Sequence, residues 1–482
     1  MKVTVLKIIV YTICISFITS CHKDEVDEDF YNEKINSNLE TEINIKLTDT
    51  VSDSYLLDVL EEEKDIISNE AQARIVDISE MVVPKTNPKK VYAHYMPWFQ
   101  SKDYDGYWGH HWTMNNQNPD IIDENGKRQI ASFFYPEIGP YSSTDPDLQE
   151  YHFLMMKLAG IDGVIFDWYG SRDYYDYGVM KEATETFMWR LEDLGLDFSI
   201  MYEDRTAVQA VDLGYASDKI SAAKEDFNYV KDTYLSSPKY MKWNDKPLMF
   251  VFGPHHIQNT SEWDEIFTVF TEDQKPHYVT LWGATNSFVG ESATGEFAWI
   301  DQTHLEAHGH YYWHMNQIIN EDKLRVGSVY PSFMNFSELG GWGLQHLWQI
   351  TPDDGNIFTE TLNYTHHQTA DFIQLVTWND FGEGTVIEPT EEFGFMYLQL
   401  IQEYTGVEYT PEDLQMAQDL YLLRKSTSNI ATDGRTTKDE TEARNTSTIA
   451  KVFLDRAYKL IKKGKTTRAK LIIEAVKRFY NN

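Results

Sequence analysis

The sequence predicts an α/β fold, a closed (β/α)8 TIM barrel with an N-terminal tether and a C-terminal helical extension. Eight short apolar runs follow one another between residues 90 and 380, and most leave room for a helix or a long loop before the next. Apolar strands that alternate with helices indicate a parallel sheet, and eight of them favour a closed barrel. An open doubly wound sheet is the alternative, but no glycine-rich phosphate-binding turn follows the first run. The candidate strands are Lys90–Pro97, Ile161–Tyr169, Phe198–Asp204, Pro247–Gly253, His277–Gly283, Phe297–Asp301, Val326–Phe333 and Phe372–Asp380.

Residues 1–20 have the features of a secretory signal. Lys2 and Lys7 supply a positive start, and the apolar core that follows is too short to span a membrane as a mature helix. The core ends at Ser20-Cys21, and a small residue before a cysteine resembles the cleavage and lipidation site of bacterial lipoproteins. We therefore expect Cys21 to become the lipidated first residue of the mature chain. A secreted soluble protein is the alternative.

The segment after Cys21 predicts where the anchored protein resides. Cys21-His22-Lys23-Asp24-Glu25 is similar to the signal that sends Bacteroidetes lipoproteins to the cell surface. The expected location is the cell envelope, at the outer membrane and facing outward. Residues 21–88 are acidic and have modest apolar content, so they predict a tether with one or two short helices ahead of a barrel at residues 89–405.

Composition argues against one class of partner. The chain has 42 basic and 76 acidic residues, a formal net charge of −34. Such a chain repels phosphate backbones, so we expect no nucleic-acid partner. Aromatic residues make up 14% of the chain. They suit stacking on sugar rings, but they serve equally as core residues.

The clearest chemical signal follows the eighth candidate strand. An apolar run from Phe372 breaks into Trp378-Asn379-Asp380-Phe381-Gly382-Glu383-Gly384, with two carboxylates three residues apart. Active sites of parallel barrels lie at this end of the strands. A carboxylate pair is also the usual means of breaking a glycosidic bond. A polar loop that caps a buried strand is the alternative.

Several other candidate strands end in carboxylates, histidines and aromatic residues, which therefore converge on one predicted face of the barrel. Asp167 and Glu203 lie at the ends of the second and third candidate strands, and they are either functional carboxylates or acceptors for loop amides. The tryptophans are either sugar-stacking platforms or wall packing. Asp380, Glu383 and Asp167 are the candidate catalytic residues. The candidate substrate-binding residues are His94, Tyr95, Trp98, Trp168, Tyr169, Glu203, Trp378 and Asn379.

The histidines give little support to a metal site. His304 and His308, like His310 and His314, have the spacing of two ligands on one helical face, but His-Glu-x-x-His is absent. Gly-x-Ser-x-Gly is absent too, which disfavours a serine hydrolase. We expect no metal and no cofactor.

Residues 406–482 predict a separate helical extension. Glu412–Lys425 has a helical pattern, Ser426–Ser447 is polar and predicts a loop, and a helical pair from Ile449 to Phe479 turns at Gly464. Its lysines and arginines predict a solvated basic face.

The motifs resemble two families of glycoside hydrolases. Trp378-Asn379-Asp380-Phe381-Gly382-Glu383 resembles the signature of glycoside hydrolase family 71, the α-1,3-glucanases. The continuation Gly384-Thr385-Val386-Ile387-Glu388-Pro389 resembles family 99, the endo-α-mannosidases. Further segments similar to family 99 are Tyr95-Met96-Pro97-Trp98, Gly139-Pro140-Tyr141-Ser142-Ser143 with Asp145, and Ala159-Gly160-Ile161-Asp162-Gly163-Val164 through Trp168-Tyr169-Gly170.

The resemblance implies a (β/α)8 barrel that hydrolyses α-linked glycans, α-glucan or α-mannan, by endo-attack. It gives Glu383 the role of general acid and Asp380 that of base or base-assisting partner, and Asp167 matches a further carboxylate of family 71. Family 99 has glutamate at the position of Asp380, whereas family 71 has aspartate and inverts the anomeric centre, so the resemblance favours inversion. A surface lipoprotein that binds glycans without cleaving them is the alternative.

Overall fold

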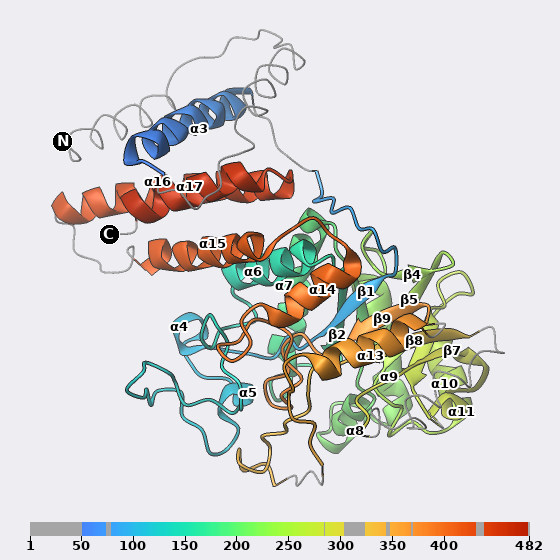
Figure 1. The fold of residues 1–482 in the computed structure, drawn as a ribbon. Coiled ribbons are helices and arrows are strands. Elements are labelled where there is room, and N and C mark those ends of the chain that lie inside the picture. Colours follow the sequence, from blue (N-terminus) through green and yellow to red (C-terminus); the bar gives the residue numbers. More distant parts are fainter. Residues whose placement is uncertain are drawn as a thin grey trace. The chain divides into compact units, whose positions relative to one another are not determined.

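The structure is a computed structural model that describes residues 51–73, 79–283, 285–302, 323–343, 348–367, 370–429 and 438–480 (Figure 1). Two compact units divide the chain: residues 79–421 form one, and residues up to 78 together with those from 422 onward form the other. The predicted signal, Cys21 and the four histidines between 304 and 314 lie outside the described residues. Among the helices that are described, none is long and apolar enough to cross a lipid bilayer.

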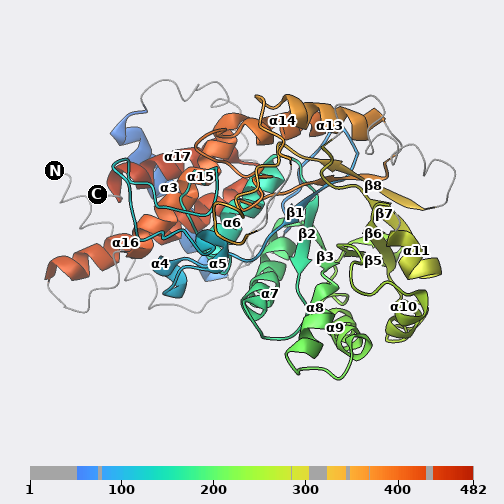
Figure 2. The same ribbon diagram turned by 90° about the horizontal axis from the view of Figure 1, so that it is seen from below.

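The larger unit is a closed barrel of eight parallel strands, which confirms the predicted fold class (Figure 2). The pairing of the first strand with the last, β1 with β9, closes the barrel, and β3 pairs directly with β5. A short strand β4 (Lys242–Trp243) adds to β5 in the antiparallel direction. The barrel strands are β1 (Val91–Tyr95), β2 (Gly163–Trp168), β3 (Asp197–Tyr202), β5 (Lys246–Val251), β6 (His277–Leu281), β7 (Ala293–Phe297), β8 (Leu324–Val329) and β9 (Phe372–Leu375).

The predicted sixth strand, Phe297–Asp301, is wrong. The strand at this place is β7, which ends where the prediction begins, at Phe297. Its sequence Ala-Thr-Gly-Glu-Phe has little apolar character, because only alternate side chains are buried. At Gly295, which pairs with Leu324, an added Cβ would lie 2.4 Å from the Leu324 carbonyl oxygen. Glycine therefore allows the close pairing of β7 with β8, but it also removes the apolar signal by which strands are predicted.

Helices cover the outside of the barrel, and short helices sit in its loops. The first covering helix is α6 (Pro146–Leu158). The Asp145 carboxylate caps its start by accepting the Asp147 N–H at 3.0 Å, and Gly160 follows its end with φ of 76°. Loop helices are α4 (Lys102–Asp105), α5 (His110–Thr113) and α8 (Arg205–Asp212). The remaining helices between the strands and after β9 are α7 (Tyr177–Leu194), α9 (Lys219–Thr233), α10 (Thr260–Phe267), α11 (Thr285–Val289), the 3-10 helix η1 (Gly290–Ser292), α13 (Asn356–His367), α14 (Met396–Thr405) and α15 (Pro411–Asn429).

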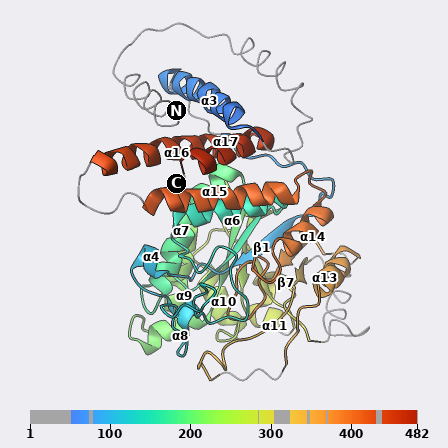
Figure 3. The ribbon, with the colours of Figure 1, turned by 60° about the vertical axis from the view of Figure 1, so that its left-hand side comes forward.

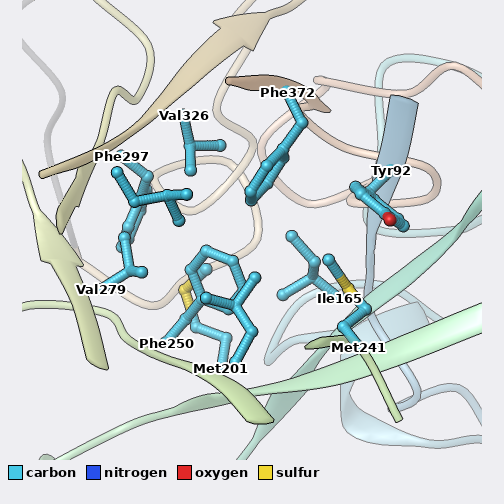
Figure 4. Close-up of a cluster of buried hydrophobic side chains, with 11 residues drawn as sticks. Tyr92, Ile165, Met201, Met241, Phe250, Val279, Phe297, Val326 and Phe372 are labelled. Carbon is cyan, nitrogen blue, oxygen red and sulfur yellow. The ribbon is translucent and has the colours of Figure 1, made fainter. Parts of the chain in front are cut away.

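The interior of the barrel is filled with apolar side chains rather than open. Figure 4 shows inward-facing residues of the strands meeting at the centre, among them Ile165, Met201, Phe250 and Phe372. The rings of Phe250 and Phe372 lie 6.3 Å apart. This packed floor leaves function to the polar residues beyond the strand ends.

The smaller unit packs three helices together: α3 (Asp53–Ala73), α16 (Lys438–Lys462) and α17 (Thr466–Phe479) (Figure 3). Glu63 of α3 is buried and accepts hydrogen bonds from Arg456 Nε at 2.6 Å and Arg468 Nε at 2.7 Å. The basic residues of the extension are thus not merely solvated, as we expected, because two of its arginines neutralise this buried glutamate.

The loop predicted over Ser426–Ser447 is also wrong at both ends, since α15 continues to Asn429 and α16 begins at Lys438. Its hydroxyl groups bond to backbone carbonyls, one within α15 and one between α16 and α15. Thr427 Oγ1 donates to the Leu423 carbonyl at 2.9 Å, and Ser447 Oγ donates to the Thr427 carbonyl at 2.6 Å. Polar residues that satisfy themselves in this way do not interrupt a helix. The turn predicted at Gly464 is confirmed, between α16 and α17.

Candidate active site

Four acidic residues from three strand ends come together at one end of the barrel. Asp167 belongs to β2, Glu203 follows β3, and Asp380 and Glu383 follow β9. Their negative charges act on one another: Asp380 on Asp167, Asp167 on Glu203, and both aspartates on Glu383. The structure therefore brings together the three predicted catalytic carboxylates and Glu203.

The environment raises the pKa of every member of this carboxylate cluster. Burial is the largest cause for each of the four. Burial and the charges of Asp380 and Asp167 raise the pKa of Glu383 to about 8. Burial and the charge of Asp380 raise the pKa of Asp167 to about 8, against a hydrogen bond from Tyr169 that lowers it. The pKa of Glu203 lies well above its usual range.

The pKa of Asp380 is raised less than those of Asp167 and Glu383, because nearby donors favour its charged form. Burial raises the pKa of Asp380 to about 6, while the amides of Glu383 and Gly382 and the His111 ring lower it. Near pH 7 Asp380 is therefore the ionised member, and Glu383 and Asp167 hold their protons. Two carboxyl groups three residues apart are thus set to opposite protonation states.

The loop after β9 fixes the pair by its own backbone. The Asp380 N–H donates to Thr377 Oγ1 at 2.7 Å, and the Glu383 N–H donates to Asp380 Oδ1 at 2.9 Å. The Glu383 carbonyl accepts the Met334 N–H from the loop after β8 at 2.8 Å. Gly384 has φ of 65°, and a Cβ there would lie 2.8 Å from Met334. Only glycine allows the two loops to approach so closely.

A buried hydrogen-bonded network fixes the loop after β9 to neighbouring segments. The Asn379 amide accepts the Met96 N–H at 2.9 Å and donates to the Met96 carbonyl at 3.0 Å, which ties the β9 loop to the end of β1. The Tyr141 hydroxyl accepts from Asn379 Nδ2 at 3.2 Å and donates to Glu388 Oε2 at 2.6 Å. Glu388 also lies 3.4 Å from His152 of α6. We did not select Glu388 or Tyr141 as site residues, although both lie in the segments that resemble family 99.

Four of the predicted substrate-binding residues are fully buried, and their burial contradicts direct contact with a substrate. Tyr95 faces the helices, where its hydroxyl bonds to His152 Nδ1 at 2.8 Å. The Trp168 ring packs against Tyr229 and Tyr234, and the Trp378 ring against His152. The fourth is Asn379, whose amide holds Met96 as described above. Asp167 and Trp168 are successive residues of β2, and successive residues of a strand point to opposite faces, so Trp168 faces away from the site when Asp167 faces into it.

The remaining predicted binding residues lie around the cluster. His94 is buried with its ring 5.1 Å from Trp299, and burial lowers its pKa to about 3, so it stays neutral. Trp98 stacks on His111 with ring centroids 4.1 Å apart and planes within 6°. Tyr169 donates its hydroxyl hydrogen bond to Asp167.

Three residues that were not selected from the sequence complete the rim: His111, Asp176 and Trp342. His111 Nε2 lies 3.3 Å from Asp176 Oδ2, and the Trp342 ring meets the His111 ring edge-on at 5.9 Å. His111 lies on α5, Asp176 before α7 and Trp342 beyond β8. Because they come from three separate loops, no local pattern joins them. No group of metal-binding type was found within the described part of the chain.

Asp204, beside Glu203, has a structural role. Its carboxylate accepts the backbone N–H groups of His255, His256 and Ile257 at 2.7 to 3.0 Å. Asp204 therefore holds the loop after β5, and Glu203 is the member of this acidic pair that reaches the cluster.

Known proteins resemble the chain in sequence and in fold. The sequence model described as glycosyl hydrolase family 99 matches residues 86–427. A glycoprotein endo-alpha-1,2-mannosidase from Xenopus laevis is 22% identical over 330 residues, which cover 62% of this chain and 69% of the relative. A glycoprotein endo-alpha-1,2-mannosidase-like protein from Mus musculus is 24% identical over 338 residues, with coverage of 62% and 69%. The solved glycoside hydrolase family 99 endo-alpha-mannosidase from Bacteroides thetaiotaomicron has a TM-score of 0.51 at 18% identity, covers 68% of this chain and 98% of its own, and supports the barrel fold.

The raised pKa of Asp167 predicts a pH-dependent gain in stability on replacement by asparagine. An unfolded aspartate ionises near pH 4, whereas folded Asp167 has a pKa of about 8. Between these values unfolding releases a proton, so the wild-type protein loses stability as the pH rises. Asp167→Asn cannot ionise at this position, so the variant does not lose this stability as the pH rises. The difference in Tm between this variant and wild type should therefore grow between pH 5 and pH 9.

The matched control is Asp212→Asn, at an exposed position of α8. Its Tm relative to wild type should stay nearly constant over the same pH range. A difference for Asp167→Asn that stays flat or shrinks with rising pH would contradict the raised pKa.

Proposed function

Because the chain belongs to glycosyl hydrolase family 99 and is therefore a glycoside hydrolase, we propose that it cleaves α-mannan within the chain, as an endo-acting α-mannosidase. The names of the two relatives, an endo-alpha-1,2-mannosidase and a protein like it, support mannose as the sugar. Membership of a hydrolase family also favours catalysis over a binding-only role. An α-glucan is the second candidate substrate, because Asp380 stands where family 71 has aspartate.

The observation that carries the mechanism is the opposite protonation of Asp380 and Glu383 near neutral pH. Glu383 donates its proton to the glycosidic oxygen as the bond from that oxygen to the anomeric carbon breaks. Ionised Asp380 accepts a proton from the water that attacks the anomeric carbon. One bond to carbon breaks, one forms, and the two carboxyl groups exchange protonation states. Proton exchange with solvent then restores the starting state.

The reach of Asp380 supports inversion. Its Oδ1 accepts the Glu383 N–H at 2.9 Å, which fixes the orientation of the carboxylate. An aspartate is one methylene shorter than the glutamate of family 99 and leaves more room between carboxylate and sugar. Inverting enzymes need this room for a water molecule, with carboxyl groups about 6.5–9.5 Å apart. Asp167 keeps its proton, because burial and the charge of Asp380 raise its pKa, and it serves as a hydrogen-bond donor toward the sugar.

Replacing Glu383 by glutamine should remove the general acid and keep the fold. We expect hydrolysis of α-mannan to fall by about 10²–10⁴-fold, the usual contribution of general acid catalysis. Release of reducing ends from α-mannan measures this loss, and circular dichroism checks the fold. Hydrolysis of a matching disaccharyl fluoride should fall far less, because fluoride leaves without a proton.

Glu391→Gln is the matched control, an exposed glutamate eight residues further along. It should retain wild-type activity. Turnover of α-mannan retained by folded Glu383→Gln protein would exclude Glu383 as the acid. A folded wild-type protein that cleaves α-glucan and leaves α-mannan intact would replace the proposed substrate by the second candidate.

We further propose that a lipid on Cys21 anchors the enzyme in the outer membrane, facing the medium. The short apolar core and the Ser20-Cys21 junction support this anchor. Placement at the surface gives a polysaccharide-cleaving enzyme access to polymers too large to enter the cell.

The Cys21→Ser variant should lose the anchor. Expressed in a Bacteroidetes host, the wild-type protein should incorporate labelled palmitate, sediment with membranes and be digested when intact cells are treated with protease. Cys21→Ser should lose the label and leave the membrane fraction. Cys14→Ser is the control, because Cys14 lies within the predicted signal and should not affect the label. Unchanged labelling of Cys21→Ser would contradict the proposal.

A further inference from the structure

A row of five tyrosines leads away from the carboxylate cluster. Tyr169, whose hydroxyl bonds to Asp167, lies 4.8 Å from Tyr177 between ring centroids. Tyr177 lies 5.1 Å from Tyr174 and 5.7 Å from Tyr175, and Tyr174 lies 5.3 Å from Tyr215. We call these five residues the tyrosine row. It is continuous by ring contact from a candidate catalytic carboxylate to the protein surface.

The middle of the row is fixed to α8. The Tyr174 hydroxyl donates to the Thr206 carbonyl at 2.7 Å, and the Tyr177 hydroxyl donates to Gln209 Oε1 at 2.8 Å. Both rings are buried. They form a rigid base, and a binding surface that is already ordered loses little entropy when a ligand binds.

The outer end of the row is exposed in a way that packing does not explain. Tyr175 is 68% exposed and Tyr215 is 56% exposed. Tyr175 also has φ of 52°, a left-handed conformation that is uncommon for a bulky residue. A strained backbone that presents an aromatic ring to water gains no stability from burial. Such outliers gather at sites that bind ligands.

The chemistry of the row suits a neutral sugar chain. The face of an aromatic ring carries partial negative charge. It attracts the C–H groups on one face of a pyranose, while the phenol hydroxyl can exchange hydrogen bonds with sugar hydroxyls. Arg172, in the same loop, is paired with Asp226 at 3.1 Å and with Glu225, so it is neutralised within the protein. The strongly acidic chain also disfavours an anionic ligand.

We propose that the tyrosine row is an outer glycan-binding subsite, along which the uncleaved part of a neutral α-linked polysaccharide lies while one bond sits at Asp380 and Glu383. The identity of the glycan as α-mannan rests on the proposed function. We expect the row to favour long chains, because a polymer can contact Tyr175 and Tyr215 while one of its bonds sits at the carboxylates.

The experiment removes the two exposed rings together, as Tyr175→Gly with Tyr215→Ala. Glycine at position 175 accepts the left-handed backbone, so the variant loses the ring without added strain. The matched control is Trp189→Ala, an aromatic on α7 that is 50% exposed and twelve residues, about 18 Å of helix, beyond Tyr177. Isothermal titration calorimetry measures the affinity of each protein for polymeric α-mannan and for an α-linked mannobiose.

The proposal predicts that the double variant loses about tenfold in affinity for the polymer, which corresponds to about 1.4 kcal/mol for the two rings together. Its affinity for mannobiose and that of Trp189→Ala for both ligands should stay at wild-type values. Tyr175→Phe should keep the polymer affinity, because the stacking face remains. An unchanged polymer affinity in the double variant would overturn the subsite, and so would an equal loss for polymer and disaccharide.

The binding readout separates this inference from the proposed function. If wild-type protein binds the polymer through the row but hydrolyses none of it, the subsite stands and the proposed cleavage fails. If hydrolysis occurs and the double variant binds the polymer like wild type, the cleavage stands and the subsite fails. A wild-type protein that does not bind α-mannan overturns the inference as stated.

Discussion

The burial of four carboxyl groups in one cluster, reinforced by repulsion between their charges, controls the chemistry of this barrel. Asp167, Glu203, Asp380 and Glu383 lie in one another's field, and in the described part of the chain no lysine or arginine is among the charges that shift the pKa of Asp167 or Glu383. Like charges in a poorly solvated place cannot all ionise. The cluster must therefore hold protons at neutral pH, and such shared protons are what an acid–base pair needs.

The surrounding structure serves to keep these groups together in spite of that cost. The apolar interior of the barrel lies beneath the cluster. Asn379 ties the loop after β9 to the end of β1, and the hydrogen bond between Tyr141 and Glu388 anchors the same loop. The Met334 N–H in the loop after β8 donates to the Glu383 carbonyl, and the two loops can approach this closely because residue 384 is glycine. A stable scaffold bears the energy of a destabilised site, as the trade-off between stability and activity leads one to expect.

The fold and the acidic residues were predictable because both leave local signals. Seven of the strands correspond to apolar runs. The sequence of β7 gives no such run, because Gly295 has no side chain and only alternate side chains of this strand are buried. The carboxylates were found because they follow strand ends. The error over Trp168 was avoidable, since Trp168 is adjacent to Asp167 in β2 and adjacent residues of a strand cannot both face the site. His111, Asp176 and Trp342 were not predictable in this way, because their meeting depends on how three long loops fold over the barrel.

The division of protons between Asp380 and Glu383 is the central claim, and the pH dependence of kcat/KM for α-mannan tests it most directly. The activity of the free enzyme should rise as Asp380 ionises near pH 6 and fall as Glu383 loses its proton near pH 8, with a maximum close to pH 7. A maximum below pH 5, or activity that stays level beyond pH 9, would contradict the account.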